Sequence, residues 1–263
     1  MTMRRFSLQG RRALVTGASS GIGRAVALGL AEHGADVVIH HFGNESGARD
    51  VARMIGGNTP VFEADFTDSA ATQAFADGVL KQCGRIDILV ANAAIEHRLP
   101  WRELNDAHID KHVASNFASL LTLTDRFVPP MMERGWGRVV ATGSIMATRP
   151  RAETVVYASL KAAQLTAIQG IAREVGHRGV TMNVVSPGAI EIEANAARYE
   201  DPVFRRAVVA KIPVGRQGQP EDLVGAFVFL CSDAAGYITG ANIPVDGGWS
   251  IGDAPGALPQ AAE

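Results

Sequence analysis

The sequence predicts an α/β fold: a single Rossmann-type, doubly wound parallel sheet of about seven strands with helices on both faces. Seven short runs of apolar and β-branched residues recur along the chain, and longer stretches with helical spacing separate them. The runs lack the alternation of polar and apolar residues that marks a half-exposed strand, so we expect strands buried on both sides. The predicted strands are residues 13–16, 36–40, 61–64, 86–91, 138–142, 180–185 and 242–245.

Length and composition favour one domain. The 263 residues are 47% hydrophobic and 20% charged, which is ordinary for a globular protein with one large core. No change in composition marks a linker, so residues 1–250 are predicted to form a single domain. Residues 251–263 are rich in Gly, Pro and Ala without periodicity, which predicts a flexible or partner-stabilised tail.

The charge pattern disfavours nucleic acid and membranes as partners. The formal net charge is −2 without a long basic run, and no segment approaches the roughly 20 apolar residues of a membrane span. A small-molecule partner and a cytoplasmic location are therefore expected. Cys83 and Cys231 stand far apart and outside C-x-x-C spacing, so we expect buried free thiols and no metal site.

A glycine-rich turn follows the first predicted strand. The run Thr16-Gly17-Ala18-Ser19-Ser20-Gly21-Ile22-Gly23 leads directly into a helical pattern over residues 22–32. Gly17 permits a tight turn, Gly21 lets the backbone approach a pyrophosphate, and Gly23 allows the helix to pack closely on the strand. The free N–H groups at the helix start would face the anion. This arrangement predicts a dinucleotide-binding site.

The same glycines also spell G-x-S-x-G, the nucleophile elbow of α/β-hydrolases, with Ser19 as the nucleophile. That site needs strands and an oxyanion loop before the motif, yet only 16 residues precede it. It also needs a histidine late in the chain, where none follows His177. A serine hydrolase is therefore the disfavoured alternative.

Tyr157 and Lys161 are predicted to act as a pair. They lie four residues apart in a stretch with helical character, residues 155–178, so their side chains emerge on one face. A free tyrosine titrates near pH 10, too high for efficient proton transfer at neutral pH. A lysine charge at about 6 Å would favour the phenolate by roughly 3 kcal/mol, or about two pKa units.

Ser144 follows the strand predicted over residues 138–142 and precedes Tyr157 by 13 residues. In open α/β sheets, ligands bind outside the carboxyl ends of the strands. Ser144 can there donate a hydrogen bond to a substrate carbonyl. A non-catalytic, dinucleotide-sensing Rossmann protein is the second alternative, and it would not need these three side chains together.

From about residue 8 to residue 249, the chain resembles a short-chain dehydrogenase/reductase. The glycine motif is residues 16–23, the strand-four motif is Ala91-Asn92-Ala93-Ala94, the active-site serine is Ser144, and the Y-x-x-x-K motif is Tyr157 to Lys161. The resemblance implies hydride transfer between a nicotinamide cofactor and a carbonyl or secondary alcohol. It gives Tyr157 the role of general acid and base, and Lys161 those of lowering the tyrosine pKa and binding the nicotinamide ribose. Asn116 would be the fourth catalytic residue, holding a water that links Lys161 to solvent.

The resemblance also implies a set of cofactor contacts. Asp65 would lie beside the adenine, Asn92 to Ala94 beside the adenosine ribose, and Ile190 beside the nicotinamide. Ile192 departs from the family, which frequently has a threonine there. The full expected set is Gly17, Ser19, Ser20, Gly21, Ile22, Gly23, His41, Asn44, Asp65, Phe66, Asn92, Ala93, Ala94, Tyr157, Lys161, Pro187, Gly188 and Ile190.

NADP(H) is favoured over NAD(H) as the cofactor. NAD-preferring relatives carry an acid at the end of strand two, which would repel a 2′-phosphate, and His41 stands in that place here. Asn44 and Ser46 could donate hydrogen bonds to the phosphate. Against this choice, no arginine stands nearby, and Ser20 occupies a position where many NADP-preferring relatives have a basic residue.

The substrate pocket is expected to use residues 95–100, 145–152 and 189–210, segments that vary within the family. Arg98, Arg149 and Arg151 in these segments could meet an anionic or polyhydroxylated substrate. A sugar or polyol, a 3-oxoacyl thioester and a small cyclic ketone all remain open. The helical runs around residues 115–132 and 155–174 have apolar positions on more than one face, which together with the resemblance predicts a homotetramer.

Overall fold

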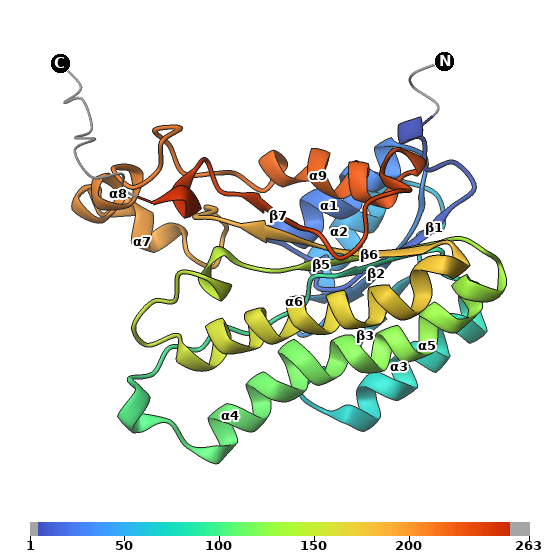
Figure 1. Cartoon of the computed structure of the whole chain (residues 1–263), viewed down its shortest axis with the longest axis horizontal. Helices are drawn as coiled ribbons and strands as arrows, with labels where there is room; N and C mark the ends of the chain where they lie inside the picture. The colour runs from blue at the N-terminus through green and yellow to red at the C-terminus, as the bar shows by residue number, and fades with distance from the viewer. Residues whose placement is uncertain (1–4, 253–263) are drawn as a thin grey trace.

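A computed structural model describes residues 5–252 and shows one seven-stranded parallel sheet (Figure 1). The strand order is β3-β2-β1-β4-β5-β6-β7. The predicted fold class is confirmed, and each strand lies within two residues of its expected bounds. The strands are β1 Arg12–Val15, β2 Asp36–His41, β3 Val61–Glu63, β4 Ile88–Ala91, β5 Gly137–Thr142, β6 Val180–Pro187 and β7 Asn242–Val245.

Helices cover both faces of the sheet (Figure 1). One face is covered by α1 (Gly21–Glu32), α2 (Glu45–Ile55) and α9 (Glu221–Cys231), and the other by α3 (Ser69–Cys83), α5 (Ser119–Glu133) and α6 (Val155–Val175). The helix α4 (Asp106–Val113) precedes α5. Two short helices, α7 (Ala196–Glu200) and α8 (Pro202–Val209), follow β6 beyond the carboxyl end of the sheet.

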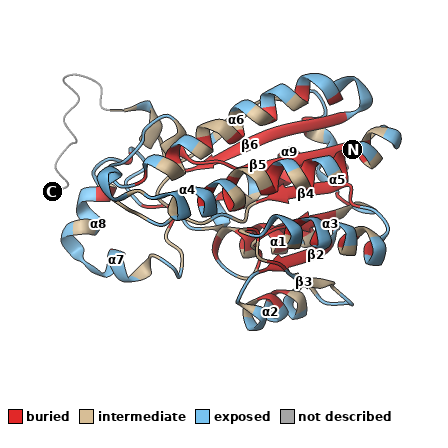
Figure 2. Ribbon diagram, turned by 90° about the horizontal axis from the view of Figure 1, so that it is seen from below, coloured by how far each residue is buried: buried red, intermediate tan, exposed pale blue. Residues whose placement is uncertain are grey.

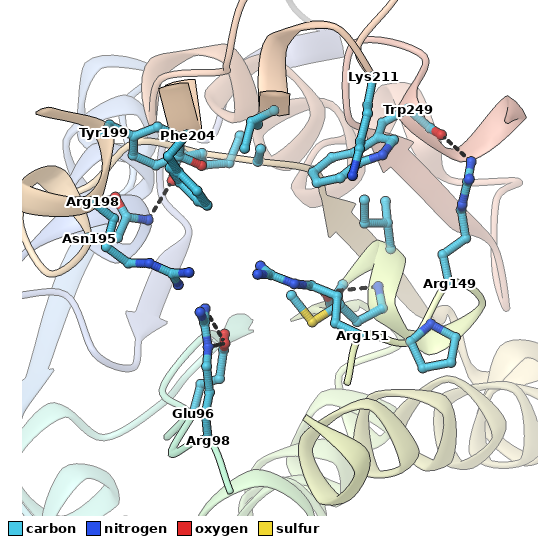
Figure 3. Close-up of a pocket in the computed structure, with 18 residues that line it drawn as sticks. Glu96, Arg98, Arg149, Arg151, Asn195, Arg198, Tyr199, Phe204, Lys211 and Trp249 are labelled. Carbon is cyan, nitrogen blue, oxygen red and sulfur yellow. Dashed lines mark hydrogen bonds and ion pairs between the residues drawn. The ribbon is translucent and has the colours of Figure 1, made fainter. Parts of the chain in front are cut away.

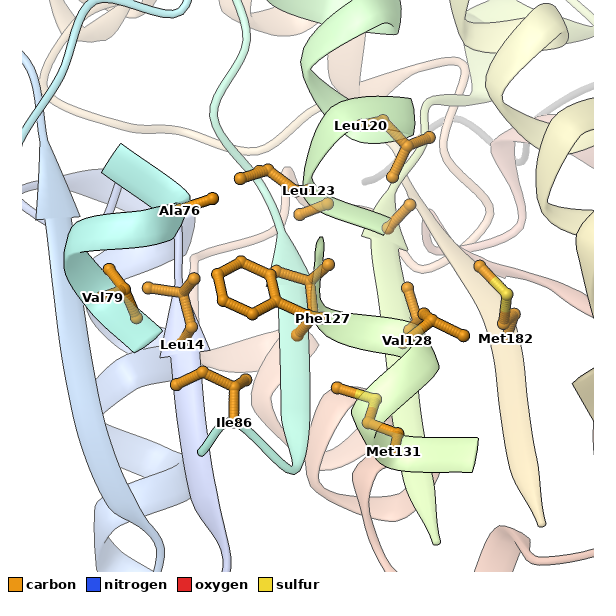
Figure 4. Close-up of a cluster of buried hydrophobic side chains, with 14 of the residues drawn as sticks. Leu14, Ala76, Val79, Ile86, Leu120, Leu123, Phe127, Val128, Met131 and Met182 are labelled. Atoms are coloured by element: carbon orange, nitrogen blue, oxygen red, sulfur yellow. The ribbon is translucent and has the colours of Figure 1, made fainter. Parts of the chain in front are cut away.

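The strands are buried on both sides because each face packs on its own helix layer (Figure 2). In β2, Val37 and Ile39 belong to the core beneath α1, α2 and α9, while Val38 belongs to the core on the other side. On that second side, Phe127 of α5 lies among Leu14 and neighbouring apolar side chains (Figure 4). This double burial explains why the strands lack a polar face in the sequence.

The topology positions the site. The chain adds strands on one side of β1 with β2 and β3, and on the other side with β4 to β7. The carboxyl ends of β1 and β4 therefore meet where the direction of winding reverses, which is the usual ligand position in such sheets.

Trp249–Ile251 form one 3-10 turn, whereas the rest of the predicted tail, residues 253–263, lies outside the described residues. Cys83 and Cys231 are buried and free, as expected. Within residues 5–252, no helix combines the length and apolar character needed to cross a membrane.

Candidate active site

The glycine turn after β1 forms a cradle for an anion. Gly17 and Gly21 have φ values of +63° and +52°, which L side chains rarely adopt. A Cβ on Gly23 would lie 2.1 Å from the Gly17 carbonyl oxygen, so helix and turn approach as closely as the sequence predicted. Ser20, the N-cap of α1, makes no side-chain capping hydrogen bond. The turn therefore leaves helix N-terminal N–H groups for a ligand.

Hydrogen bonds from β4 hold this turn in place. The Thr16 hydroxyl accepts from the backbone N–H groups of Asn92 (2.9 Å) and Ala93 (3.0 Å). The Asn92 amide donates to the carbonyl oxygens of Thr16 (2.9 Å) and Gly17 (3.2 Å), and its oxygen accepts from Thr142 of β5 (3.1 Å). Asn92 thus joins three strand ends, a structural role that the sequence did not reveal.

His40 supports the turn from the other side. Its Nδ1 accepts from Gly17 N (3.1 Å), so the ring proton is on Nε2, which lies 3.0 Å from the Ala64 carbonyl oxygen. Burial lowers the His40 pKa to about 4, so the ring is neutral at pH 7. The ring also stacks on Phe66 with centroids 4.1 Å apart. Strand alternation could have identified His40, but the sequence analysis selected its neighbour.

His41 and Asn44 do not line the cleft next to the turn. His40 and Phe42 line it instead, because successive side chains at a strand end point to opposite faces. His41 is buried, with no hydrogen-bond partner for Nδ1 among the described residues. Asn44 caps α2 and accepts from Gly47 N (3.1 Å). The structure therefore does not bring these two residues to the cleft, and their contact with a cofactor stays a prediction.

The cleft, about 620 Å³ in volume, brings most of the predicted cofactor residues together. From that set it is lined by Gly17, Ser19, Ser20, Gly21, Ile22, Gly23, Asp65, Phe66, Asn92, Ala93, Ala94, Tyr157 and Lys161. It also includes residues outside that set: His40, Phe42, Ala64, Thr67, Ile95, His97, Lys111, Ser115 and Thr142. Ile95 and His97 belong to a segment that was expected in the substrate pocket. Ile192, identified as a departure from the family, also lines it.

Tyr157 and Lys161 lie one turn apart near the start of α6, as predicted. The Lys161 ammonium nitrogen is 5.4 Å from the centre of the Tyr157 ring and donates to the Thr142 carbonyl oxygen (2.6 Å). Ser144 caps the turn after β5, and its hydroxyl oxygen accepts from Met146 N (3.1 Å). The hydroxyl proton of Ser144 is therefore available for donation.

Burial dominates the pKa values of this pair. It raises the pKa of Tyr157, the Glu96 carboxylate raises it further, and a hydrogen bond with Ser144 acts in the opposite direction. Burial lowers the pKa of Lys161 to about 8, against the opposing effect of Glu96. The expected lowering of the Tyr157 pKa by Lys161 is not seen, because desolvation of the phenolate dominates and Lys161 is not among the groups that shift this pKa. Glu96 was not identified from the sequence.

Asn116 lies in a π-helical turn, Ala114–Ala118, between α4 and α5. Such turns occur frequently at functional sites. Its amide nitrogen donates to Ile95 O and its amide oxygen accepts from Ile95 N, both at 2.8 Å. Gln164 of α6 donates to the Asn116 carbonyl oxygen. Asn116 thus ties the loop after β4 to α6, the helix that carries Tyr157 and Lys161.

A second pocket of about 500 Å³ adjoins Ser144 (Figure 3). Residues from all three predicted segments line it, together with Lys211 and Trp249. Gly188 and Ile190, expected to contact a cofactor, line this pocket, whereas Pro187 is buried at the end of β6 and lines neither space.

The loop after β6 rests on the glycine turn. Ile192 Cγ2 would be 3.3 Å from a Cβ placed on Gly21, and the Glu193 carboxylate accepts from Gly21 N (3.2 Å). Glu193 also lies 3.9 Å from Arg24 of α1. One acidic side chain therefore uses an N–H group of the anion cradle.

Comparison with known proteins agrees with this geometry. The family described as enoyl-(acyl carrier protein) reductase matches residues 17–250. A 3-oxoacyl-[acyl-carrier-protein] reductase of Salmonella typhimurium is 36% identical over 243 residues, 92% of this chain and 98% of the relative. The chain belongs to the short-chain dehydrogenase/reductase family.

Two sugar-acid dehydrogenases are also similar to the chain over almost its whole length. A 2-dehydro-3-deoxy-D-gluconate 5-dehydrogenase of Pseudoalteromonas atlantica is 36% identical over 250 residues, 94% of this chain and 98% of the relative. The crystal structure of a gluconate 5-dehydrogenase from Burkholderia cenocepacia, in complex with NADP and tartrate, has a TM-score of 0.89 at 32% identity. The match covers 96% of this chain and 100% of that one.

Membership of the short-chain dehydrogenase/reductase family confirms the predicted enzyme class, an oxidoreductase. The hydrolase alternative also lacks a base. Within residues 5–252, Ser19 makes no side-chain hydrogen bond to a histidine, and the His40 ring is engaged by Gly17 and Ala64.

Proposed function

We propose that this short-chain dehydrogenase/reductase transfers a hydride between a nicotinamide cofactor and a carbonyl or secondary alcohol carbon, with Tyr157 as general acid and base. The proposal rests on the position of Tyr157. Its side chain lines the cleft beside the glycine turn together with Lys161, and Ser144 of the adjoining pocket is close enough to lower its pKa. A proton donor thus stands where the two spaces meet.

The cleft fits a dinucleotide. A Cβ on Gly17 would lie 3.1 Å from the Ala93 backbone and one on Gly21 would lie 3.3 Å from Ile192, so only glycine keeps the cradle open. The N–H groups of this turn would bind the pyrophosphate, Asp65 and Phe66 would flank the adenine, and Lys161 would bind the nicotinamide ribose. When bound, the nicotinamide supplies or accepts the hydride.

The side chains around Tyr157 supply the proton chemistry. The raised pKa of Tyr157 keeps its phenol protonated at neutral pH, ready to donate to a carbonyl oxygen. Ser144 Oγ would donate a second hydrogen bond to the same oxygen and so fix its position. Lys161, charged below about pH 8, would stabilise the phenolate that remains after proton donation. Asn116 would position the loop and helix around these groups.

For the cofactor, we propose a preference for NADP(H) over NAD(H). The gluconate 5-dehydrogenase from Burkholderia cenocepacia has NADP bound. Asp65 lines the cleft here, but its carboxylate accepts from the backbone and hydroxyl of Thr67, both at 2.8 Å. At the end of β2 the cleft is lined by His40 and Phe42, neither of which repels a 2′-phosphate.

The remaining expectations concern assembly and location. We propose a homotetramer, supported by apolar side chains that are exposed on α4, α5 and α6, namely Ile109, Val113, Leu121 and Val155. Light scattering at micromolar concentration should give four times the 27.8 kDa of one chain, and a mass near one chain contradicts the proposal. The two free thiols support a reducing, cytoplasmic location.

The catalytic proposal is tested by following nicotinamide absorbance with a panel of ketones and secondary alcohols and both cofactors. We expect turnover by the wild-type protein and a loss of at least about 100-fold in Tyr157→Phe, the usual effect of removing a general acid. Cofactor binding should survive, because the ring remains. Tyr237→Phe is the matched control, since Tyr237 is fully exposed. Turnover in Tyr157→Phe above about a tenth of the wild-type rate would reject the role.

A further inference from the structure

Five cationic side chains and one acidic side chain line the pocket beside Ser144, in a chain whose net charge is −2. The cations are Arg98, Arg149, Arg151, Arg198 and Lys211, and the acid is Glu96. They come from loops and helices that are far apart in the sequence. The fold therefore collects positive charge at the one place where a substrate would meet Ser144.

Two of the cations have partners within the protein. Arg98 forms an ion pair with Glu96, with nitrogen–oxygen distances of 2.7 and 2.8 Å. Arg149 donates to the Trp249 carbonyl oxygen (2.6 Å) and points away from the centre of the pocket (Figure 3).

The other three cations lack acidic partners. Within residues 5–252, Arg151, Arg198 and Lys211 form no ion pair and donate no side-chain hydrogen bond, although Arg198 lies 4.8 Å from the Phe204 ring. The guanidinium groups of Arg151 and Arg198 point toward each other and toward Arg98 across the pocket (Figure 3). The like charges of Arg151 and Arg198 repel each other, whereas Glu96 offsets the charge of Arg98.

The pKa of Tyr199 is a second indication that these guanidinium groups lie close together. Its side chain is buried at the wall of the pocket, and burial raises its pKa. Arg151 and Arg98, which belong to different loops, both act in the opposite direction on that pKa. Both guanidinium groups are therefore close enough to affect the same hydroxyl group.

We propose that the pocket binds a small organic anion as substrate, with Arg151 and Arg198 holding its carboxylate or phosphate group while its carbonyl or alcohol carbon lies at Ser144 and Tyr157. This inference rests on the proposed function and specifies its substrate class. Guanidinium groups bind such oxyanions through paired hydrogen bonds, and one anion between them replaces repulsion by attraction. The volume of about 500 Å³ suits a small metabolite.

The position of the charges favours a small acid over an acyl chain on an acidic carrier protein. A carrier protein would dock on the outer surface, whereas these guanidinium groups are directed into the pocket (Figure 3). Arg98 differs from the other two in being held by Glu96, so it is expected to shape the wall more than to bind the anion.

The decisive experiment compares matched substrates with the proposed cofactor. A panel of four- to six-carbon hydroxy acids is assayed beside their uncharged primary amides and the phosphate esters of the corresponding polyols. We expect an acid or a phosphate ester to exceed its uncharged counterpart by at least about tenfold in kcat/KM. The acid and phosphate arms then identify which oxyanion is bound. Equal values of kcat/KM for the acids and their amides would overturn the proposal.

Variants locate the binding group. In Arg151→Gln and Arg198→Gln, the preference for the anion should fall by about 10- to 100-fold, mainly through KM. Arg173→Gln is the control with the same loss of charge, since Arg173 is exposed in the last turn of α6. A preference that survives both pocket variants, or falls equally in the control, assigns the selectivity elsewhere and overturns the proposal.

Direct binding separates this inference from the proposed function. Calorimetric titration of the same acids into Tyr157→Phe with NADP bound measures the anion site without turnover. Binding that weakens with salt and in the arginine variants supports the anion site even where every substrate assay fails, an outcome that would reject only the proposed function. No binding of any small anion, with turnover restricted to carrier-bound thioesters, overturns the inference and leaves the oxidoreductase standing.

Discussion

In the cleft, the polar side chains that hold the glycine turn are hydrogen-bonded to the protein itself, while in the neighbouring pocket several charges have no partner among the described residues. Thr16, Asn92 and His40 each bind backbone groups of adjacent strands, so the glycine turn is fixed before any ligand arrives. Within residues 5–252, Arg151 and Arg198 form no ion pair. The difference supports a cleft preorganised for the proposed cofactor, whereas the pocket leaves its charges for a ligand to satisfy.

The two regions also differ in how the chain builds them. Most cleft residues lie in short motifs directly after β1, β3, β4 and β5, where the sheet alone sets their position. The pocket is assembled from loops after β4, β5 and β6 and from α7 and α8. Substitutions in the cleft should therefore affect stability and cofactor binding, and substitutions in the pocket should affect the choice of substrate.

The largest effect should come from Lys161, a buried charge at the boundary between the two regions. Its pKa falls from 10.5 to about 8 on folding, so between these values the unfolded chain binds more protons. The contribution of Lys161 to the free energy of unfolding should then rise with pH from about 8 to 10, with a limit of about 3 kcal/mol. Urea unfolding of the wild-type protein and of Lys161→Met at pH 7, 8, 9 and 10 measures this contribution. It is the change with pH in the difference between the free energies of unfolding of the two proteins.

The comparison stops at pH 10, because the titration of another group changes the stability of both proteins above that pH. Above it, the raised pKa of Tyr157 acts in the opposite direction, since the unfolded chain loses a phenol proton that the folded protein keeps. Parallel stability curves for the two proteins between pH 8 and 10 would show that Lys161 is not desolvated as described.

A methyl group added to the glycine turn of the cleft should have the second-largest effect. In Gly23→Ala the new Cβ meets the Gly17 carbonyl oxygen, which cannot move without disturbing the turn, so we expect a loss of about 1–3 kcal/mol and weaker binding of NADP. Gly225→Ala in α9 is the matched control, because nothing lies within 4 Å and the residue is exposed. That variant should gain up to about 1 kcal/mol from helix propensity. Equal effects in thermal unfolding would refute the close approach.

An acidic residue introduced at the end of β2 should change the cofactor preference. Phe42 is 60% exposed and lines the cleft, so Phe42→Asp should shift the ratio of kcat/KM about tenfold toward NAD by repelling a 2′-phosphate. His41→Asp should instead lower the melting temperature, since it buries an unpaired carboxylate. A ratio that responds to position 41 and not to position 42 would reverse this placement.

The smallest effect is expected where the loop after β6 meets the cradle. Glu193 is exposed and lies on Gly21 N, where a pyrophosphate would compete with it. Glu193→Gln should tighten NADP binding by roughly two- to fivefold at low salt, and the gain should shrink as salt is added. Glu200→Gln, an exposed acid at the end of α7, is the control. Unchanged affinity in fluorescence titration would mean that Glu193 moves aside at no cost.

Much of the fold and of the chemistry was predictable because it depends on local pattern. Each of the seven apolar runs is a strand in the structure, because a strand buried on both faces is marked in the sequence by a continuous apolar run. The glycine turn and the Tyr157–Lys161 pair follow from spacing along one turn or one helix face. At the end of β2, His40 and Phe42 line the cleft and His41 does not, because a shift of one residue in a strand exchanges the two faces.

By itself, the sequence determined the strands, the glycine cradle and the Tyr157–Lys161 pair, because each is encoded within a few consecutive residues. Only the tertiary structure decided the π-helical turn at Asn116, the influence of Glu96 on Tyr157, and the convergence of Arg98, Arg151 and Arg198. These features join segments separated by tens of residues. Their distances are set by strand order and by loops that have no periodicity, so no local pattern could have indicated them.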